Sequence, residues 1–356
     1  MFVLFLAGCA GVSDSPRRAA VSWEELPGWR ADDHATALPV FLRSCEKLRG
    51  EKWRAACAAA ARLSSGDGDS ARRFFEEYFS PHQLLDENGG SEGLITGYYE
   101  PLLRGATAKS ARYPYPIYAR PADLLTVSLG ELYPELKNRR VRGRVSGGEV
   151  VPYYSRAEID GGGAPLAGGE ILWVDDKYAL FFLHIQGSGL VRLPDGRIIG
   201  VGYRDQNGHP YRSIGRLLIA RGEMTAAEVN LFSLREWLEK NPSRADALLH
   251  DNPSYVFFSR RDEIGIGPRG ATGVMLTPER SLAADFSVVP RGAPVWLDAK
   301  TPDDGEPLQR LMFAQDSGGA IKGAVRADFF WGRGERAEKM AGLMKERGRL
   351  FVLLPR

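Results

Sequence analysis

Apolar residues occur mostly in short runs bounded by glycine and proline, a pattern that predicts strands joined by tight turns. The stretch from Phe313 to Gly332 shows it most clearly, because several glycines divide its apolar segments. Asp316 and Asp328 lie inside this apolar frame, where a carboxylate is unfavourable unless it is hydrogen-bonded or protonated. Both are therefore candidates for chemistry, and turn capping in a glycine-rich hairpin is the alternative.

The first ten residues form an apolar run that is too short to span a bilayer as a helix. Residues 6–9 match a lipobox, the site where a bacterial signal peptide is removed and the new terminal cysteine is acylated, so lipidation is predicted at Cys9. An ordinary apolar terminus with a chance cysteine is the alternative. No Lys or Arg precedes the run, so we expect the true start to lie upstream. Residues 1–9 would then be a lipoprotein signal, and residues 10–21 a flexible tether.

Helical spacing replaces this pattern further along. Apolar residues recur every three or four positions over residues 34–63, and Gly50 divides the run into two predicted antiparallel helices. Cys45 and Cys57 would lie on the facing sides of this pair. Export to an oxidising compartment favours a disulfide between them over two buried free thiols. A third helix is predicted at residues 69–78.

The next part of the chain carries aromatic and polar side chains of the kinds that bind carbohydrates. A strand predicted at residues 93–101 carries Tyr98 and Tyr99, which either pack in a core or offer platforms for sugar rings. Residues 179–189 are predicted to form an apolar strand that opens into a polar loop. Amide, imidazole and hydroxyl groups at such loops match the hydroxyls and amides of a sugar, and ordinary turn residues are the alternative. The groups concerned are Gln186, Gly187, Ser188, Asn207 and His209.

Further elements complete the pattern. Residues 265–270 match the dinucleotide-binding G-x-G-x-x-G, but residues 274–278 look like a strand, so no helix amino terminus is available for a pyrophosphate. Helices are expected at residues 213–221, 226–241 and 337–344, and strands at 288–297 and 350–355.

Composition narrows the class of protein. The chain has 356 residues, enough for about two domains, and its 41 glycines and 22 prolines favour a β-rich protein with peripheral helices. A net charge of +2 gives no reason to expect nucleic acid as a partner. The five histidines lack metal-ligand spacing, and we expect neither a metal nor another cofactor. With metal catalysis poorly supported, the chemistry that the sequence favours is acid–base catalysis by carboxylates.

Three short segments each hold one of the embedded aspartates: residues 280–285 with Asp285, 314–323 with Asp316, and 326–332 with Asp328. They resemble the domain named for its three aspartates, the 3D domain. Together with residues 95–101 and 184–189, they make the chain similar, from about Ser22 to its end, to the membrane-bound lytic murein transglycosylase A family.

This resemblance implies a fold that periodicity alone does not predict. The fold would be mainly β with peripheral helices. A double-psi β-barrel catalytic domain would be built from residues 22–103 and 253–356. A smaller β-barrel domain, residues 104–252, would be inserted into it, and a glycan strand would lie in the groove between the two.

The resemblance also implies an activity, that of a peptidoglycan lytic exotransglycosylase, although the sequence itself does not separate exo from endo action. Such a lyase cleaves the β-1,4 bond between N-acetylmuramic acid and N-acetylglucosamine and leaves 1,6-anhydro-N-acetylmuramoyl ends. Asp328 would act as acid and then as base, supported by Asp316, Asp285 and Lys322. Burial among aromatic neighbours would raise the pKa of Asp328. The alternatives are a non-catalytic peptidoglycan-binding lipoprotein module and a hydrolase that leaves reducing ends.

The partners implied are peptidoglycan glycan strands, with cell-wall synthesis or divisome proteins beyond them. The lipid at Cys9 would hold the protein on the periplasmic face of the outer membrane, because Ala10 rather than an aspartate follows the cysteine. The residues expected to touch the glycan are Tyr98, Tyr99, Gln186, Gly187, Ser188, Asn207 and His209.

Overall fold

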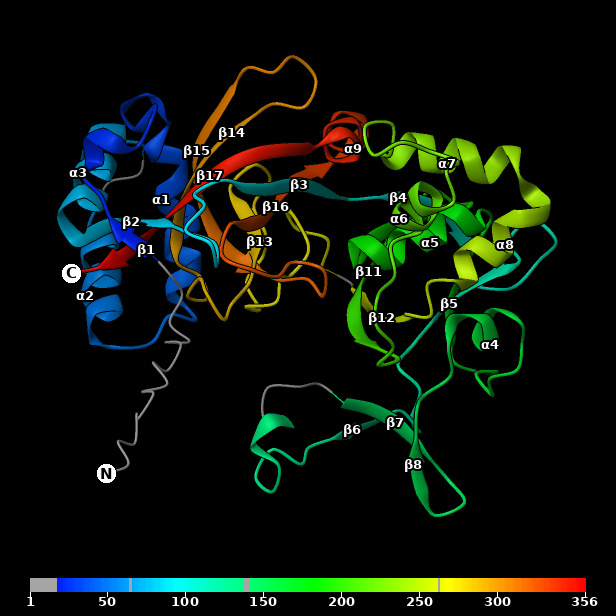
Figure 1. Ribbon diagram of the computed structural model, residues 1–356. Helices are drawn as coiled ribbons and strands as arrows, with labels where there is room; N and C mark the ends of the chain where they lie inside the picture. Colours follow the sequence, from blue (N-terminus) through cyan, green and yellow to red (C-terminus); the bar gives the residue numbers. More distant parts are fainter. Residues whose placement is uncertain (1–17, 64–65, 137–140, 262) are drawn as a thin grey trace, which may run out of the picture.

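The computed structural model describes residues 18–63, 66–136, 141–261 and 263–356 (Figure 1). Two sheet-based regions lie side by side, and a small third sheet projects from one of them. Cys9, the expected lipidation site, lies outside the described residues. Residues 18–20, assigned to the tether by sequence, instead form β1 (Arg18–Ala20), which pairs antiparallel with β2 (Phe79–Leu84). None of the described helices is long and apolar enough to cross a membrane.

The larger sheet closes on itself. β17 pairs with both β14 and β3, so the strands β3, β16, β13, β15, β14 and β17 form a ring, and β2 and β1 extend it from β17. The expectation of a mainly β fold is confirmed, whereas the double-psi connection stays a prediction. The strands not yet bounded are β3 (Gly93–Glu100), β13 (Ser281–Ala284), β14 (Pro294–Lys300), β15 (Pro307–Asp316), β16 (Arg326–Arg333) and β17 (Lys345–Pro355).

Three helices cover one side of this barrel: α1 (His34–Cys45), α2 (Glu51–Ala60) and α3 (Gly68–Tyr78) (Figure 1). Their apolar faces pack on residues that point outward from the barrel strands, including Trp296 and Phe313, while the alternating neighbours of these residues fill the barrel interior. α1 and α3 begin at the aspartates Asp33 and Asp67, whose side chains accept backbone N–H groups of the first turn. The predicted disulfide between Cys45 and Cys57 is confirmed, with the two Cα atoms 5.7 Å apart.

A second sheet, of six strands, forms the other region. A bridge between Ala119 and Phe258 brings its two edge strands together. The sheet extends from residue 102 to residue 261, beyond the expected bounds of 104–252 at both ends. In spatial order its strands are β12 (Val256–Arg261), β11 (Ile198–Gln206), β10 (Ser188–Arg192), β4 (Leu102–Ala106), β9 (Glu170–Val174) and β5 (Tyr115–Tyr118).

The strand expected at residues 179–189 is wrong, because α5 (Lys177–Gln186) lies there. The side chain of Asp176 accepts the N–H groups of Tyr178 and Ala179 and so begins the helix. Gly187, with φ of 78°, ends it in the left-handed conformation. The helix is buried on most sides, so its apolar residues show no helical period.

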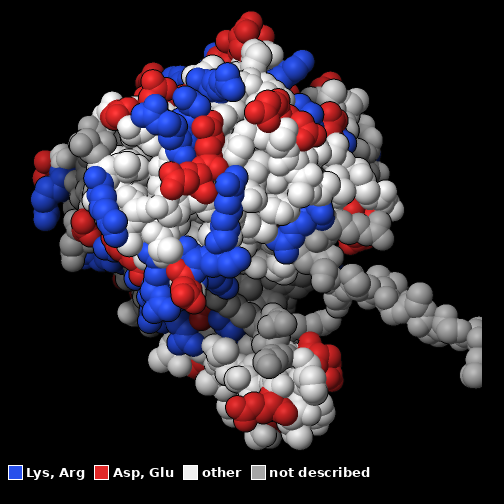
Figure 2. Space-filling model, turned by 90° about the vertical axis from the view of Figure 1, so that its left-hand side faces the viewer, with Lys and Arg blue, Asp and Glu red and all other residues white. Residues whose placement is uncertain are grey.

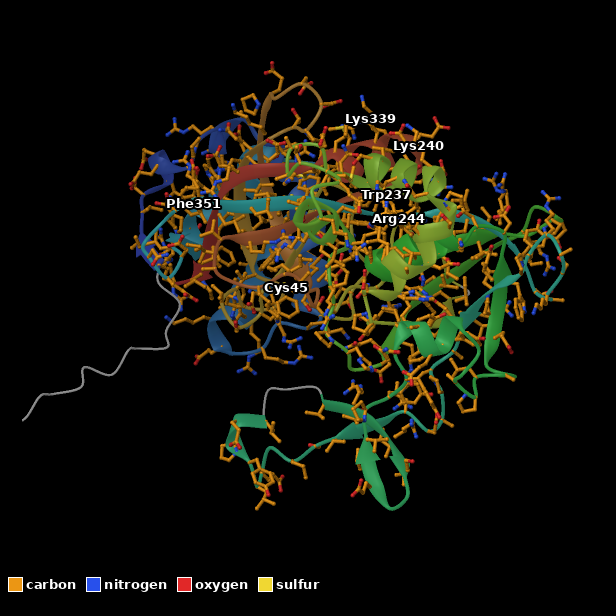
Figure 3. The ribbon with its side chains drawn as sticks, turned by 45° about the vertical axis from the view of Figure 1, so that its right-hand side comes forward. Cys45, Trp237, Lys240, Arg244, Lys339 and Phe351 are labelled. Carbon is orange, nitrogen blue, oxygen red and sulfur yellow. A yellow bond between two sulfur atoms is a disulfide. The ribbon has the colours of Figure 1, made fainter. Side chains whose placement is uncertain are left out.

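Further helices cover this second region. Asn230 caps α7 (Leu231–Lys240), so this helix begins five residues later than its apolar spacing predicts. In Figure 3, Trp237 of α7 lies beside Arg244 of the unpredicted α8, and both side chains donate to Glu223. The other helices are α4 (Arg156–Asp160), α6 (Ile214–Ala220) and α8 (Pro242–His250).

The remaining elements are short or terminal. β6 (Leu125–Val127), β7 (Val141–Ser146) and β8 (Glu149–Val151) form the third sheet, which projects from the second region (Figure 1). α9 (Gly334–Leu343) lies against β3 and β16. The strand expected at residues 274–278 is wrong: there, only Met275 makes an isolated bridge, to Arg269, because this segment turns sharply beside the barrel.

A buried ion cluster joins the two regions where the chain passes between them. Glu100 ends β3, and its side chain is fully buried. Arg261, at the end of β12, and Arg333, at the end of β16, each donate to one of its oxygens. Arg333 also donates to the carbonyl of Ile264, in the segment that returns from the second region. The cluster therefore fixes one end of each region against the other.

The surface charge is mixed. Figure 2 shows the face that carries α1, α2 and α3, where basic and acidic side chains are interspersed. Neither sign dominates this face, in keeping with the net charge of +2.

Candidate active site

Strand pairing brings two of the three aspartates to one level of the barrel. Ala283 of β13 is the register partner of Asp328 on one side and of Asp316 on the other. Asp316 is the last residue of β15, and Asp285 follows the end of β13. Three segments that are distant in sequence therefore place their carboxylates around the end of one short strand.

Asp328 lies beside a small apolar cluster, which we call the apolar floor, that includes Phe330, Tyr98 and Ala283. Alternation along β16 puts Phe329 in the barrel core, while Phe330 shares the face of Asp328 and packs against Tyr98 and Ala283. Burial on this floor is the main cause that raises the pKa of Asp328, to about 6, and the negative charge of Asp316 acts in the same direction. The positive charge of Arg326 and a hydrogen bond from Thr96 oppose the rise.

The hydrogen bonds of Asp328 reach only one of its oxygens. The hydroxyl of Thr96 donates to Oδ1 at 2.8 Å, and among the described residues no donor reaches Oδ2. Asp328 is also partly accessible to solvent. One carboxyl oxygen is therefore free to exchange a proton with a bound molecule.

Asp316 has both oxygens occupied. The hydroxyl of Tyr98 donates to Oδ2 at 3.0 Å, and the backbone N–H of Ala271 donates to Oδ1 at 2.8 Å. Burial raises the pKa of Asp316, and these bonds, with one from the N–H of Ser317, oppose the rise. The side chain therefore ties β15 to β3 and to the loop before β13, and its charge acts on Asp328.

Both carboxylate oxygens of Asp285 also accept hydrogen bonds. Its Oδ1 accepts the N–H and the hydroxyl of Ser287, and its Oδ2 accepts the N–H of Gly323. Burial acts to raise its pKa, but these hydrogen bonds and the charge of Lys322 together lower it. Asp285 thus holds the loop between β15 and β16 to the end of β13, while the Lys322 side chain itself is exposed.

Tyr98 and Tyr99 are both buried, and this favours core packing over sugar platforms. The Tyr99 hydroxyl donates to Glu338 of α9, and burial is the main cause that raises the pKa of this phenol. The backbone N–H of Tyr99 donates to Oε1 of Gln186, at the end of α5. Gln186 therefore links the second region to β3 and stays partly exposed beside the site.

The remaining predicted glycan contacts separate into two groups. Asn207 is only 1% exposed, donates to the carbonyls of Tyr154 and Pro253 and accepts the N–H of Tyr255, so its side chain is engaged by the backbone around it and its contact with a glycan stays a prediction. A turn residue can look free in sequence and still be consumed by the backbone around it.

Ser188 is also buried, in β10. Gly187 and His209 keep partial exposure, although Nε2 of His209 lies 2.7 Å from the carbonyl of Tyr153. Glycan contact by these two residues stays a prediction.

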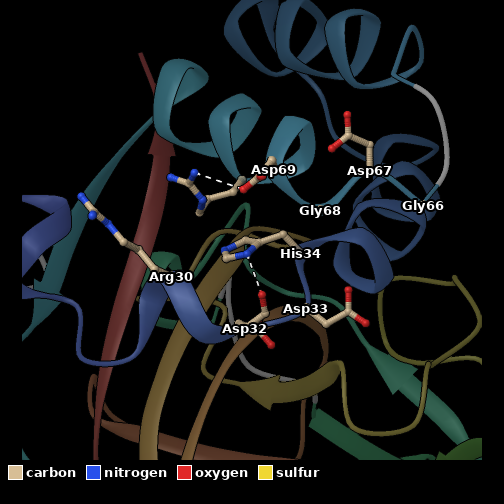
Figure 4. A pocket seen from close by; sticks show the side chains of 9 residues that line it. Arg30, Asp32, Asp33, His34, Gly66, Asp67, Gly68 and Asp69 are labelled. Carbon is tan, nitrogen blue, oxygen red and sulfur yellow. Dashed lines mark hydrogen bonds and ion pairs between the residues drawn. The ribbon is translucent and has the colours of Figure 1, made fainter.

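Two cavities lie elsewhere. One, of about 400 Å³, lies between the amino termini of α1 and α3 (Figure 4), and the other, of about 700 Å³, lies beside Arg280 and Arg310. Neither is lined by Asp328. Within the described part of the chain, no group of three or more His, Cys, Asp or Glu side chains could hold a metal ion.

Sequence reasoning missed Thr96 and Arg326. Arg326 donates to Thr96 at 2.8 Å, and Thr96 donates to Asp328. Both residues stand inside the segments that carry the family resemblance, yet only the parallel register of β3 and β16 shows that they meet. A polar threonine in the middle of an otherwise apolar and aromatic strand was the available signal.

Known families and proteins match most of this chain. The model of the MltA specific insert domain matches residues 94–259, and that of the 3D domain matches residues 280–354. Membrane-bound lytic murein transglycosylase A of Escherichia coli strain K12 is 33% identical over 341 residues, which cover 91% of this chain and 82% of that protein.

Solved structures extend the likeness to the fold. The crystal structure of MltA from Neisseria gonorrhoeae, in its monoclinic form, is 36% identical, covers 95% of this chain and 92% of its own, and has a TM-score of 0.80. That of E. coli MltA with bound chitohexaose is 26% identical, covers 96% and 93%, and has a TM-score of 0.70. Since identity above 30% extends over most of both chains, this chain belongs to the membrane-bound lytic murein transglycosylase A family.

Proposed function

We propose that the protein is a lytic transglycosylase that cleaves the β-1,4 bond between N-acetylmuramic acid and N-acetylglucosamine in peptidoglycan and leaves 1,6-anhydro-N-acetylmuramoyl ends. The names of its relatives and the chitohexaose bound to one of them support a glycan substrate. The barrel ring supplies the scaffold, and Asp328 supplies the chemistry.

One observation carries the proposal. Of the three aspartates, Asp328 alone has a carboxyl oxygen without a hydrogen-bond donor among the described residues, and it alone has a pKa raised to about 6. An ordinary glycosidase needs a second free carboxylate to attack the sugar or to activate water. Asp316 and Asp285 are held by donors on both oxygens, so neither is free for that role.

A single carboxyl group suffices when the substrate supplies its own nucleophile. Protonated Asp328 gives its proton to the glycosidic oxygen as the bond from that oxygen to the anomeric carbon breaks. The C6 hydroxyl of the muramoyl sugar then attacks the anomeric carbon, and ionised Asp328 takes the hydroxyl proton. The proton lost in the first step returns in the second, and no water is consumed.

Purified sacculi test this function. The wild-type protein should release soluble muropeptides whose anhydro ends are one water lighter than reducing ends. Asp328→Asn keeps the shape of the side chain but removes its titratable proton, so release should fall by a factor on the order of 10²–10⁴ with folding retained. Asp195→Asn, in the exposed turn after β10, is the matched control and should keep full activity.

Other outcomes would identify the alternatives. Binding to sacculi without release would favour a non-catalytic peptidoglycan-binding module. Release of reducing ends would favour a hydrolase. A fully active Asp328→Asn protein would exclude Asp328 as the acid.

Glycan contact is proposed for Gln186, Gly187 and His209, which stay partly exposed near the end of α5 and after β11. Polar groups at such element ends are common in binding sites. His209→Ala should weaken the binding of chitooligosaccharides and lower the free energy of unfolding by no more than the loss of its hydrogen bond to Tyr153, about 0.5–1.5 kcal/mol. Unchanged affinity would place the glycan elsewhere.

Membrane attachment is proposed through a lipid on Cys9, with the protein on the periplasmic face of the outer membrane. The lipobox and the word "membrane-bound" in the names of relatives support this. Cys9→Ser should release the protein into the soluble periplasmic fraction, and retention in the membrane would contradict the proposal. Cell-wall synthesis or divisome proteins are proposed as partners, to be sought by crosslinking of the anchored protein.

A further inference from the structure

Arg326, Thr96 and Asp328 are linked by two consecutive hydrogen bonds that lead to the carboxyl group of the site. Nη2 of Arg326 donates to Oγ1 of Thr96 at 2.8 Å, and Oγ1 of Thr96 donates to Oδ1 of Asp328 at 2.8 Å. Arg326 forms no ion pair within the described part of the chain; its positive charge lowers the pKa of Asp328 directly, and its hydrogen bond to Thr96 adds a second link to the same carboxyl.

Strand geometry makes this chain of contacts rigid. Arg326 and Asp328 are two residues apart on β16 and share one face. Their register partners on the parallel strand β3 are Leu94 and Thr96. Nη1 of Arg326 donates to the carbonyls of Leu94 and Ala327, so the guanidinium is held by backbone atoms of both strands.

The direction of each hydrogen bond follows from the groups involved. A guanidinium has N–H donors and no acceptor, so Oγ1 of Thr96 must accept in its contact with Arg326. The ionised carboxylate of Asp328 has no hydrogen to give, so the single hydrogen of the Thr96 hydroxyl points to Oδ1. If the Thr96 hydroxyl keeps this direction when the carboxyl is protonated, Oδ1 stays an acceptor and the proton lies on Oδ2.

We propose that Thr96 and Arg326 are positioning residues that keep Oδ1 of Asp328 as a permanent acceptor and so confine the exchangeable proton to Oδ2. The inference rests on the proposed function, because it names which oxygen gives the proton to the glycosidic oxygen and takes it from the C6 hydroxyl. One oxygen then serves both steps without rotation of the carboxyl group.

The charged surroundings of Asp328 are few. Arg326 faces it from β16, Asp316 from β15 and Tyr98 from β3, while β13 presents only Ala283 at this level. Thr96 and Arg326 stabilise the ionised carboxylate, and burial and Asp316 favour the protonated acid. Loss of the Thr96 hydroxyl should therefore raise the pKa of Asp328, which makes the carboxyl a weaker proton donor to the glycosidic oxygen, and should leave its proton free to sit on either oxygen.

Thr96→Val tests the proposal, since valine keeps the shape and β-branching of threonine without the hydroxyl. Titration of the Asp328 carboxyl by carbon NMR, assigned by its loss in Asp328→Asn, should show a pKa about one pH unit above that of the wild type. In muropeptide release, kcat should fall about tenfold with KM nearly unchanged. The pH at which activity declines on the alkaline side should rise.

Comparison variants separate positioning from folding. Thr96→Ser restores the hydroxyl and should restore the wild-type titration and kcat. Arg326→Gln should move the titration in the same direction as Thr96→Val. Thr126→Val, on the exposed part of β6, is the matched control and should change neither readout.

Specific results would overturn the proposed roles of Thr96 and Arg326. An Asp328 titration and a pH profile unchanged in both Thr96→Val and Arg326→Gln would overturn the proposal, as would a Thr96→Ser protein that behaves like Thr96→Val. If Thr96→Val does not fold, Arg326→Gln and Thr96→Ser carry the test. The NMR titration needs no substrate, so a wild-type protein without activity would refute the proposed function and still leave the roles of Thr96 and Arg326 measurable.

Discussion

The hydroxyl of Tyr98 donates to Oδ2 of Asp316 across 3.0 Å, joining β3 to the end of β15. Together with the N–H of Ala271 on the other oxygen, it holds Asp316 as a fixed charge rather than a reacting group. Asp316 is level with Asp328 on the opposite side of β13, so this fixed charge acts on the pKa of Asp328 and raises it.

Asp316→Asn should therefore lower the pKa of Asp328 below its wild-type value of about 6. The first step needs the protonated acid, so a lower pKa leaves less of the active form at neutral pH. The high-pH decline of kcat/KM in muropeptide release should move to lower pH. Tyr98→Phe keeps the charge of Asp316 and is the comparison variant. A decline that stays in place, or moves upward, would contradict this role for Asp316.

Glu100 should be a major contributor to stability. Its carboxylate is fully buried between Arg261 and Arg333, which belong to different regions of the fold. Glu100→Ala leaves two guanidinium groups without their partner, at a cost of about 3–5 kcal/mol in the free energy of unfolding. Urea denaturation would measure the loss, with the exposed Glu149→Ala as control. A loss below about 1 kcal/mol would show that the cluster does not hold the two regions together.

Asn207→Ala should destabilise the second region instead of weakening glycan binding alone. Removal of the amide leaves the carbonyls of Tyr154 and Pro253 and the N–H of Tyr255 without partners in a buried setting. Each such bond contributes about 0.5–1.5 kcal/mol, so a total of about 2–4 kcal/mol is expected. Thermal and urea denaturation would test it. A stable variant with reduced affinity for glycan would favour the role predicted from sequence.

Local patterns predicted local structure well. The helical spacing of residues 34–63, divided at Gly50, led to α1, α2 and the bond from Cys45 to Cys57, because each feature depends on neighbours within a few turns. The same reasoning failed at α5, where a buried helix is apolar all round and its period disappears.

The long-range part of the site was beyond pattern reasoning. The apolar frame singled out the embedded aspartates and the family resemblance gave Asp328 its catalytic role, but the pairing of β3 with β16 joins residues more than 200 positions apart, and nothing in either strand alone indicates it. Thr96 gained its role only from that register. Nor does the sequence show that Asn207 is buried, since a polar residue at a turn does not reveal how many backbone groups it will bind.

Loss of the disulfide should destabilise the helical side of the barrel moderately. Cys45 and Cys57 close a loop of 12 positions between α1 and α2, and a loop of this length corresponds to about 2–3 kcal/mol of chain entropy in the unfolded state. The Cys45→Ala, Cys57→Ala double variant should lose that amount in urea denaturation while still folding. An unchanged midpoint would mean that the packing of α1 on α3 and β15 fixes these helices by itself.

His184 should make the fold sensitive to acid. It lies buried in the last turn of α5, and Nη2 of Arg156 is 3.1 Å from its Nδ1. A guanidinium can only donate, so Nδ1 accepts and the ring is neutral with its hydrogen on Nε2. Burial is the main cause that lowers the pKa of His184 well below its usual value, and the positive charge of Arg156 adds to it.

The sign of the effect follows from proton binding. Below about pH 6.5 the imidazole of the unfolded chain takes up a proton and that of the folded protein does not, so the free energy of unfolding falls as the pH falls. The loss from this one group approaches about 1.4 kcal/mol per pH unit, until the pH reaches the folded pKa. His184→Gln keeps an acceptor for Arg156 and removes the titration. Urea denaturation of both proteins between pH 7 and pH 5 isolates this group, because Asp328 and the other shifted groups contribute equally to each. The stability advantage of the wild type over His184→Gln should shrink as the pH falls, and a constant difference across that range would mean that the buried imidazole accepts a proton in the folded state.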